Sequence, residues 1–454
     1  MKNLEYKGIW WTPNNPEITV SGTLVYTENN GSNLEIIGTF NKSGEDNYNI
    51  ILGKTINGKD ITLHNCLTIN ESFNSNELTI TNIFAHTIFD GVHFNTNEDI
   101  EFDEISCHYS NVDEWAGFEC FKITNEKKGQ VIRYRYPKSI CAGIDNNYAV
   151  EVFAKTSFSS SSFGQKEINI VQKIYVKVKN KNLNSFEDHV EMVQHMGRFI
   201  SLGIGEPIIQ FEMIGQSPAN KREYDDNIIY PDIKIYPYVK NESVNNRQVH
   251  RYNMLFNLKE IEDHFEVHIK KWFDNKELLN PINNLYFGTI YNREMFLEQR
   301  FLSLVQALES YHRRTRNNSE VEDEKHKIRI DSVLNSVHRE HREWLKSKLR
   351  YSNEPGLRKR LKELFAGIDI FENLESSKKR RLFISKICDT RNYLTHYDVT
   401  LRKNSFKDKE LVAVCEELKV IILFCLLVET GLDTSYIKEK IKKKYERYEL
   451  FKLL

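Results

Sequence analysis

Residues 384–396 read Ile-Ser-Lys-Ile-Cys-Asp-Thr-Arg-Asn-Tyr-Leu-Thr-His, a composition typical of one helix. At ~100° per residue, Arg391 lies within the apolar stripe of this helix, which consists of Ile384, Ile387 and Leu394. His396 lies roughly 140° from Arg391 around the helix axis. The small, mainly polar side chains between them are Cys388, Asn392 and Thr395. The stretch therefore offers a permanent cation, a titratable ring and small polar neighbours on one side.

This pattern has a catalytic and a structural interpretation. In the catalytic one, Asn392 is about one helical turn from His396 and orients the imidazole. In the structural one, His396 ends a helix and interacts with its dipole, while Arg391 pairs with an acid such as Asp398, two turns on along the same face. The six residues 391–396 alone favour the structural interpretation, so the context must decide.

Composition and charge bound the class of protein. The chain has 454 residues, 40% hydrophobic and 28% charged, which is long enough for two or three domains with their own cores. The net charge is −1, but residues 1–250 carry 23 Lys+Arg against 32 Asp+Glu, and residues 251–454 carry 40 against 32. A basic half suggests a polyanionic partner, although lysine-rich helices alone would give the same balance.

Cysteine usage and hydropathy point to a cytoplasmic protein with reduced thiols. The seven cysteines are odd in number and include no CxxC pair, so a disulfide framework or zinc site is not favoured. The first residues do not resemble a signal peptide. The longest apolar run, 420–428, is too short to span a bilayer and predicts the central buried helix of a bundle.

Residues 1 to about 155 predict a β-rich region. Short alternating strands separated by Asn, Gly and Ser turns indicate an antiparallel sandwich or barrel. Trp10 and Trp11 are more typical of its core than of a ligand platform. A helix should begin after Ser185, with Asp188 completing a capping pair, and Gly203 and Gly205 should end it.

From about residue 258 the hydrophobic period becomes helical. This pattern predicts an up-down bundle without internal repeats. The expected helices are 258–274, 293–316, 328–350, 355–366, 376–396, 408–430 and 433–448. The chain is therefore predicted to be an α+β protein with a β-rich N-terminal part and an all-α C-terminal part.

Other titratable residues are weaker candidates. Glu309 and His312 lie one turn apart on a helix that could face residues 391–396, and Arg313, Arg314 and Arg316 follow them. Either Glu309 positions Arg391 and the arginines are cations for a phosphate, or this is a solvated helix end. Asp389 is on the His396 stripe and either interacts with the imidazole or is simply exposed. His338 and His341 have metal-ligand spacing, but the sequence places no third ligand and the alternating Arg and Glu predict a solvated face.

The spacing of Arg391 and His396 resembles the catalytic motif of HEPN-domain ribonucleases. The wider wording Thr390 to Asp398 resembles the ApeA-like branch, which acts in bacterial anti-phage defence. Residues 301–310 are similar to an early helix of that family. The N-terminal layout, including 8–11 and 51–59, resembles the N-terminal domain of ApeA proteins. The resemblance implies a sensor or regulatory domain over 1–250 and a HEPN nuclease domain over 251–454.

The resemblance also implies an activity. It is a metal-independent endoribonuclease of abortive infection that leaves 2′,3′-cyclic phosphate and 5′-OH ends, with no cofactor and no metal. The implied catalytic residues are Arg391, Asn392 and His396, and the supporting residues are Glu309, Asp389, Thr395 and Tyr397. The implied partners are an RNA substrate with tRNA among the candidates, a second copy of the chain bound through the helical domain, and a phage protein as trigger. The alternative is a non-catalytic HEPN dimerisation or binding module that senses a phage component and docks a partner.

Overall fold

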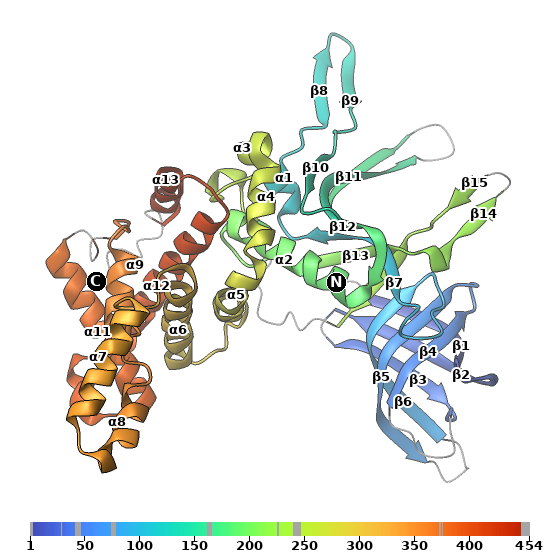
Figure 1. Ribbon diagram of the computed structural model, residues 1–454. Helices are drawn as coiled ribbons and strands as arrows, with labels where there is room; N and C mark the ends of the chain where they lie inside the picture. Colours follow the sequence, from blue (N-terminus) through green and yellow to red (C-terminus); the bar gives the residue numbers. More distant parts are fainter. Residues whose placement is uncertain are drawn as a thin grey trace. The chain divides into compact units, whose positions relative to one another are not determined.

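The structure is a computed structural model that describes residues 3–28, 30–40, 47–73, 79–160, 166–224, 227–238, 247–371, 374 and 376–445 (Figure 1). The chain forms two compact units, residues 1–270 and 271–454. The first is β-rich and the second is helical, so the predicted α+β class is confirmed. The domain assignment with a boundary after residue 250 stays a prediction.

The first six strands of unit 1 form a closed antiparallel barrel. They pair in the order β6-β3-β2-β1-β4-β5, and β5 pairs with β6 to close the ring. Trp10 is fully buried among the aliphatic side chains of this core, as predicted. Gly53 faces it, and a Cβ there would lie 2.3 Å from the indole ring. The strands are β1 (Asn3–Thr12), β2 (Asn15–Thr27), β3 (Gly31–Ile37), β4 (Asn47–Thr55), β5 (Asp60–Phe73) and β6 (Thr79–Asp90).

A second run of strands continues the same sheet from β6. Its order is β10-β11-β12-β7-β13-β16, and β16 pairs with β6. The strands are β7 (Glu101–Tyr109), β10 (Ile140–Gly143), β11 (Tyr148–Ser160), β12 (Ile168–Ser185), β13 (Gln210–Gln216) and β16 (Ile233–Pro237). Two separate ribbons belong to the same unit: β8 (Phe121–Glu126) with β9 (Gly129–Tyr134), and β14 (Arg222–Tyr224) with β15 (Asn227–Ile229).

Helix α2 (Phe186–Ile204) packs against β7 and β12. Its N-terminus is as predicted, because Ser185 Oγ accepts a hydrogen bond from the Asp188 N–H at 3.2 Å. Gly205 ends the helix with φ of 72°, whereas Gly203 lies inside it. The smaller helices of this part are α1 (Val112–Ala116), α3 (Leu258–Ile261) and α4 (Phe265–Asp274), and α4 runs into unit 2.

Unit 2 is built around α12, whose residues 420–427 are all buried. Helix α6 contacts α12, α5, α9 and α11, and α13 packs on α12. The predicted central helix is therefore confirmed. The helices are α5 (Lys276–Tyr291), α6 (Leu297–Thr315), α7 (Asp323–Ser336), α8 (Arg342–Leu349), α9 (Leu357–Phe365), α11 (Ser377–His396), α12 (Asp408–Glu429) and α13 (Thr434–Tyr445).

Two helical predictions were wrong. Helix α5 was not among the expected helices. Pro281 lies inside it, yet its buried Leu279, Ile282 and Tyr286 pack well enough to outweigh the lost backbone bond. The single helix expected over 328–350 is divided into α7 and α8. Arg342 stabilises the break, because its Nε donates to the Val337 carbonyl at 3.1 Å.

Candidate active site

Helix α11 carries the Arg391–His396 motif at its C-terminal end. Ser376 caps its start by accepting a hydrogen bond from the Lys379 N–H at 3.1 Å. Ile384 and Ile387 are buried, and α11 packs against α6 and α9. The helix that contains residues 301–310 therefore packs against the helix that carries the motif.

Arg391 is half-buried and has an unusual set of partners for a guanidinium. Its Nη1 donates to Asn392 Oδ1 at 3.1 Å. No carboxylate of the described residues lies within ion-pair distance of it. Asn392 therefore contacts the arginine, and the expected hydrogen bond from Asn392 to His396 is not formed between these two described residues. A permanent positive charge that lacks an internal anion is available to an external one.

His396 is the last residue of α11 and is exposed. Among the residues that the structure describes, none forms a hydrogen bond or ion pair with its ring. Asp398 is engaged elsewhere, because Oδ1 accepts from the Thr400 hydroxyl at 2.7 Å and from the Thr400 N–H at 2.9 Å. The Thr400 hydroxyl, then its N–H and then the nearby His396 lower the pKa of the Asp398 carboxyl. The pairing of Arg391 with Asp398 that the structural interpretation required is not formed.

Glu309 lies in the same neighbourhood as Arg391 without binding it. The charged groups that act on the Cys388 thiol come from three helices. Burial raises the pKa of Cys388; Arg358 and Arg391 oppose the rise, and Asp389 and Glu309 add to it. No hydrogen bond or ion pair joins Glu309 to Arg391, both of which are described. Glu309 can therefore act on Arg391 only through space in this arrangement.

The other three supporting residues lie on or just after α11. Asp389 Oδ1 lies 3.8 Å from Arg358 Nη2 of α9, rather than beside His396. Thr395 Oγ1 donates back to the Arg391 carbonyl at 2.7 Å. Tyr397 ends the helix at φ of 52°, a conformation unfavourable for a bulky side chain, and its ring lies edge-on to Tyr393. None of the three contacts the His396 ring.

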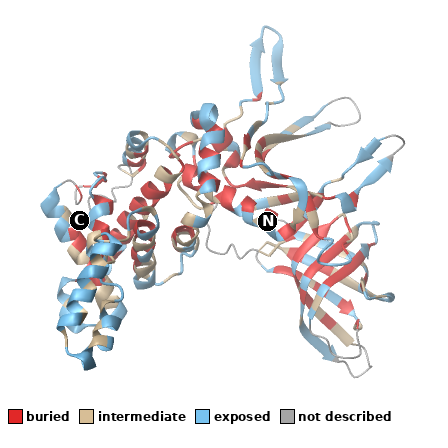
Figure 2. Cartoon of the chain, viewed as in Figure 1, coloured by how far each residue is buried: buried red, intermediate tan, exposed pale blue. Residues whose placement is uncertain are grey.

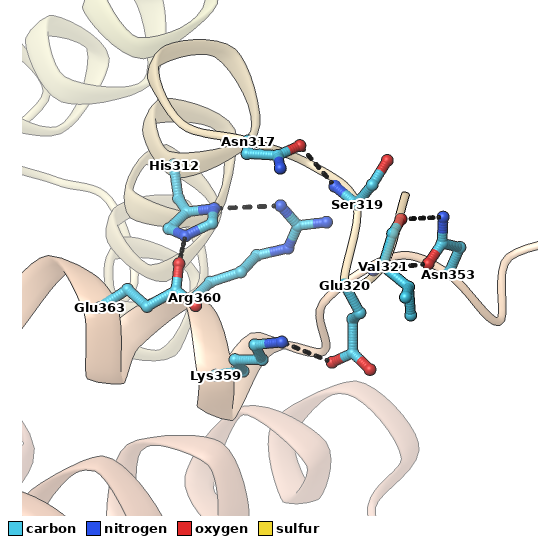
Figure 3. Close-up of polar contacts among 9 residues, drawn as sticks. All are labelled: His312, Asn317, Ser319, Glu320, Val321, Asn353, Lys359, Arg360 and Glu363. Atoms are coloured by element: carbon cyan, nitrogen blue, oxygen red, sulfur yellow. Dashed lines mark hydrogen bonds and ion pairs between the residues drawn. The ribbon is translucent and has the colours of Figure 1, made fainter. Parts of the chain in front are cut away.

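A second Arg–His pair lies where α6 meets α9 (Figure 3). His312 and Arg360 are buried, and Arg360 Nη1 lies 3.2 Å from His312 Nδ1. Because a guanidinium only donates, Nδ1 must accept, so the ring proton is on Nε2. That nitrogen donates to Glu363 Oε2 at 2.7 Å. Both ring nitrogens of the buried His312 are thus engaged, so the solvated helix end considered from the sequence does not match its position.

The same network engages the arginines that follow His312. Arg313 Nη2 lies 2.6 Å from Glu354 Oε2, and Arg360 Nη2 lies 3.5 Å from the same oxygen. Burial, and then the charge of Arg313, lower the pKa of Arg360. Arg314 donates to the carbonyl oxygens of residues 277 and 278. These contacts hold helices together and leave Arg313 and Arg314 less available to a phosphate.

Sequence reasoning missed Thr390, which anchors the segment after the motif. It is fully buried; its Oγ1 donates to the Lys386 carbonyl at 2.7 Å and accepts from the Phe406 N–H at 2.9 Å. The only available signal was a threonine in mid-helix, where it can bond back to the preceding turn.

The two histidines with metal-ligand spacing lie on the protein surface. His338 and His341 are exposed, with ring centroids 6.1 Å apart. In the part of the chain that the structure describes, no three His, Cys, Asp or Glu side chains are grouped so as to hold a metal ion. None of the helices in that part has the length and apolar character to cross a bilayer.

Comparison with known families covers most of the chain. Residues 5–272 match the family described as ApeA N-terminal domain 1, and residues 302–436 match Apea-like HEPN. The comparisons with curated proteins and with solved structures gave no match. The first family alone spans more than half of the chain, and the second includes all of α11. The chain therefore belongs to the ApeA-like HEPN family of anti-phage defence proteins.

Proposed function

We propose that this chain is a metal-independent endoribonuclease whose site is formed by Arg391, Asn392 and His396. One observation carries the proposal: Arg391 and His396 share a helix end and lack a carboxylate partner among the described residues. Two nearby cations do have carboxylate partners, Arg358 with Asp389 and Lys386 with Glu410. A guanidinium and an imidazole without an internal anion suit an external phosphate.

The proposed reaction is an internal transesterification of RNA. A base takes the proton of a ribose 2′-OH; the O2′–P bond forms as the P–O5′ bond breaks, and the leaving O5′ takes a proton. The products are a 2′,3′-cyclic phosphate and a 5′-OH end. His396 suits the proton transfer. Arg391 suits the charge that develops on the phosphorane, and Asn392 fixes the guanidinium through its 3.1 Å hydrogen bond.

One motif supplies one imidazole, although the reaction needs a base and an acid. We therefore propose a homodimer through the helical region, in which two copies of α11 line one cleft. Light scattering should find an even oligomer. A strict monomer that still cleaves RNA at full rate would contradict this arrangement.

We further propose that residues 1–250 sense a phage protein and restrain the nuclease until that protein binds. Cleavage would then be part of abortive infection. The motivation is compartmental: a cytoplasmic ribonuclease that cleaves RNA, tRNA included, would damage its own cell. Restraint predicts that residues 251–454 expressed alone are more toxic than the full chain, and that His396→Ala removes the toxicity. A folded but inactive fragment beside a freely cleaving full chain would mean that the N-terminal region assists catalysis.

The deciding experiment is an RNA-cleavage assay of the purified full chain in EDTA, followed by analysis of the product ends. We expect cyclic phosphate and 5′-OH ends, and loss of cleavage in His396→Ala. The matched control is His341→Ala, which removes an exposed histidine outside the site. Equal cleavage by His396→Ala and the parent would contradict the proposal. A chain that protects against phage equally well without His396 would favour the non-catalytic binding module.

A further inference from the structure

The ribbon β8–β9 is exposed on both of its faces. All residues of β8 and all of β9 except Tyr134 are exposed, and Figure 2 draws the ribbon almost entirely in pale blue. It projects from unit 1 next to β10 and β11 (Figure 1). A two-stranded ribbon without a packed face is marginally stable in water. An exposed ribbon of this kind is therefore a candidate binding surface for a partner molecule.

The charge of this segment is opposite to that of its surroundings. Residues 121–138, here called the basic ribbon, contain six Lys+Arg and one Glu, in a half of the chain that is otherwise acidic. Lys122 lies directly opposite Arg133 across the two strands, which is unfavourable for like charges. No described carboxylate forms an ion pair with any of the six cations, which are Lys122, Lys127, Lys128, Arg133, Arg135 and Lys138.

Aromatic rings gather where the basic ribbon meets the sheet. Tyr134 lies at the centre: its ring centroid is 4.9 Å from that of Phe121, 5.2 Å from Tyr136 and 5.9 Å from Phe158 of β11. Its hydroxyl is hydrogen-bonded to Thr156 at 2.5 Å, which fixes the cluster to β11. Tyr136 is 71% exposed and Phe158 is 54% exposed, so the cluster presents open rings to solvent.

Strand alternation separates the two kinds of side chain. Phe121 and Tyr134 are paired on one face of the ribbon, and Lys122 and Arg133 are paired on the other. The ribbon is only two strands wide, so a single-stranded polynucleotide that crosses its edge can place its phosphates against the cations of one face while its unpaired bases stack on the rings of the other. A folded duplex offers the phosphates but hides the base faces.

We propose that the basic ribbon and its aromatic cluster bind a single-stranded polynucleotide. Phosphates contact the Lys122 and Arg133 side, and unpaired bases stack on Tyr136 and Phe158. The surface lies wholly in unit 1 and does not depend on any cleavage at α11. An acidic polypeptide would satisfy the cations but would have no planar bases for the open rings.

The ribbon β14–β15 is a matched comparison within the same unit. It is also a two-stranded ribbon with exposed apolar residues, among them Ile228. Residues 222–229 contain one Arg against three acidic residues, and Lys221 forms an ion pair with Glu223 at 2.6 Å. It therefore offers an exposed ribbon without the excess of free cations.

The test measures fluorescence anisotropy of a labelled 12-residue oligonucleotide with the full-length protein at several salt concentrations. One arm uses 2′-O-methyl RNA, which lacks the attacking hydroxyl, and the other uses DNA of the same sequence. Binding in either arm supports the proposal, and the ratio of the two affinities identifies RNA or DNA as the source. Neither oligonucleotide has a free 2′-OH, so the proposed nuclease cannot cleave it. A failure to bind is therefore distinguishable from a failure to cleave.

Two double variants separate the two contributions. Lys122→Gln with Arg133→Gln should reduce the slope of log K against log salt by about 1.4, since each phosphate contact in a single strand contributes about 0.7. Tyr136→Ala with Phe158→Ala should weaken binding about tenfold or more at an unchanged slope. Tyr134 is kept because it fixes the cluster. The control Arg222→Gln with Ile228→Ala should bind like the parent.

Three results would overturn the proposal. The first is equal affinity and equal salt slope in the parent and both basic-ribbon variants. The second is tighter binding of a duplex of the same sequence. The third is competition by a polyglutamate of equal charge as effective as that by unlabelled oligonucleotide, which would assign the surface to an acidic protein. Circular dichroism of each variant checks that these exposed substitutions leave the fold intact.

Discussion

Unit 2 contains two Arg–His pairs that the structure treats in opposite ways. Arg360 and His312 are buried, bonded to each other and surrounded by Glu354 and Glu363. Arg391 and His396 lie at the end of α11, half-buried and exposed, and the described residues give neither a carboxylate partner. The residue types are the same, so the difference comes from the surroundings.

The comparison distinguishes a structural pair from one available for chemistry. In the buried pair the imidazole has both nitrogens engaged, one accepting and one donating, so it has no free position for a proton transfer. Both terminal nitrogens of the Arg360 guanidinium also have partners, and only its Nε has none among the described residues. In the open pair, both nitrogens of His396 and most donors of Arg391 remain for a ligand. In unit 2, the Arg–His pair that lacks a carboxylate partner among the described residues is therefore the one available to a ligand.

The largest expected effect is on RNA cleavage by the open pair. Arg391→Gln should lower the cleavage rate about 10²- to 10³-fold, because it removes the charge that stabilises the phosphorane. The free energy of unfolding should change by less than about 0.5 kcal/mol, since no buried partner is lost. Single-turnover rates and urea titration measure the two quantities. The control is Arg381→Gln, an exposed arginine on the same helix; a comparable rate loss there would contradict a specific role for Arg391.

The buried pair should show the reverse behaviour. Arg360→Gln should lower the free energy of unfolding by about 3 kcal/mol, because it leaves His312 and nearby carboxylates without a buried partner. Arg313→Gln is the matched control, since Arg313 pairs with the same Glu354 oxygen but is half-exposed, and it should cost less than about 1 kcal/mol. Denaturant titration of both variants measures the difference. Equal losses would show that burial does not separate these arginines.

The sequence predicted the fold better than it predicted the partners of the site. The Ser185 and Gly205 caps of α2, the buried run of α12 and the core position of Trp10 follow from local pattern and hydrophobic period, and all are present. Helix α5 was missed. It contains Pro281, which disfavours a helix locally, and packing of its buried residues outweighs that cost. The separation of α7 from α8 likewise depends on Arg342 side-chain bonds that no periodicity encodes.

Site residues could be named from the motif, but their contacts could not. Helical spacing suggested Asn392 beside His396, whereas the amide faces the neighbouring guanidinium. Spacing also placed His312 beside Glu309 among the candidates. The buried Arg360 that binds His312 lies 48 residues away in sequence, so helical spacing could not predict this contact. Contacts between distant helices are set by tertiary packing, and a single sequence carries no record of them.

A smaller effect on stability should distinguish a buried from an exposed threonine of α11. Thr390→Val should lower the free energy of unfolding by about 1–2 kcal/mol, because the buried Phe406 N–H loses its acceptor. Thr395→Val removes a similar back-bond to the preceding turn but at an exposed position, and should cost less than about 0.5 kcal/mol. Thermal melts of the two variants provide the measurement. A larger loss from Thr395 would mean that the end of α11 is more enclosed than described.

The smallest effect concerns Asp398, the carboxylate nearest in sequence to His396. Its folded-state pKa is lowered, first by the Thr400 hydroxyl, so its charge stabilises the folded state above the unfolded pKa of about 4. That stabilisation is lost as the pH falls through the folded pKa. Asp398→Asn keeps an acceptor for Thr400 but removes the charge. The variant should therefore melt slightly below the parent at pH 7 and together with it near pH 2.

The same variant tests whether the Arg391 pair is open. If Asp398 acts only on Thr400 and, through space, on His396, then Asp398→Asn and Arg391→Gln should change the melting temperature additively at pH 7. If the carboxylate closes on Arg391 in solution, the double variant would lose less than the sum of the two single losses. High salt separates the cases further, because a screened surface interaction fades while a local hydrogen bond to Thr400 persists. Additive losses of melting temperature at low and at high salt would mean that Arg391 has no ion pair with Asp398 in solution. The proposed phosphate contact requires this.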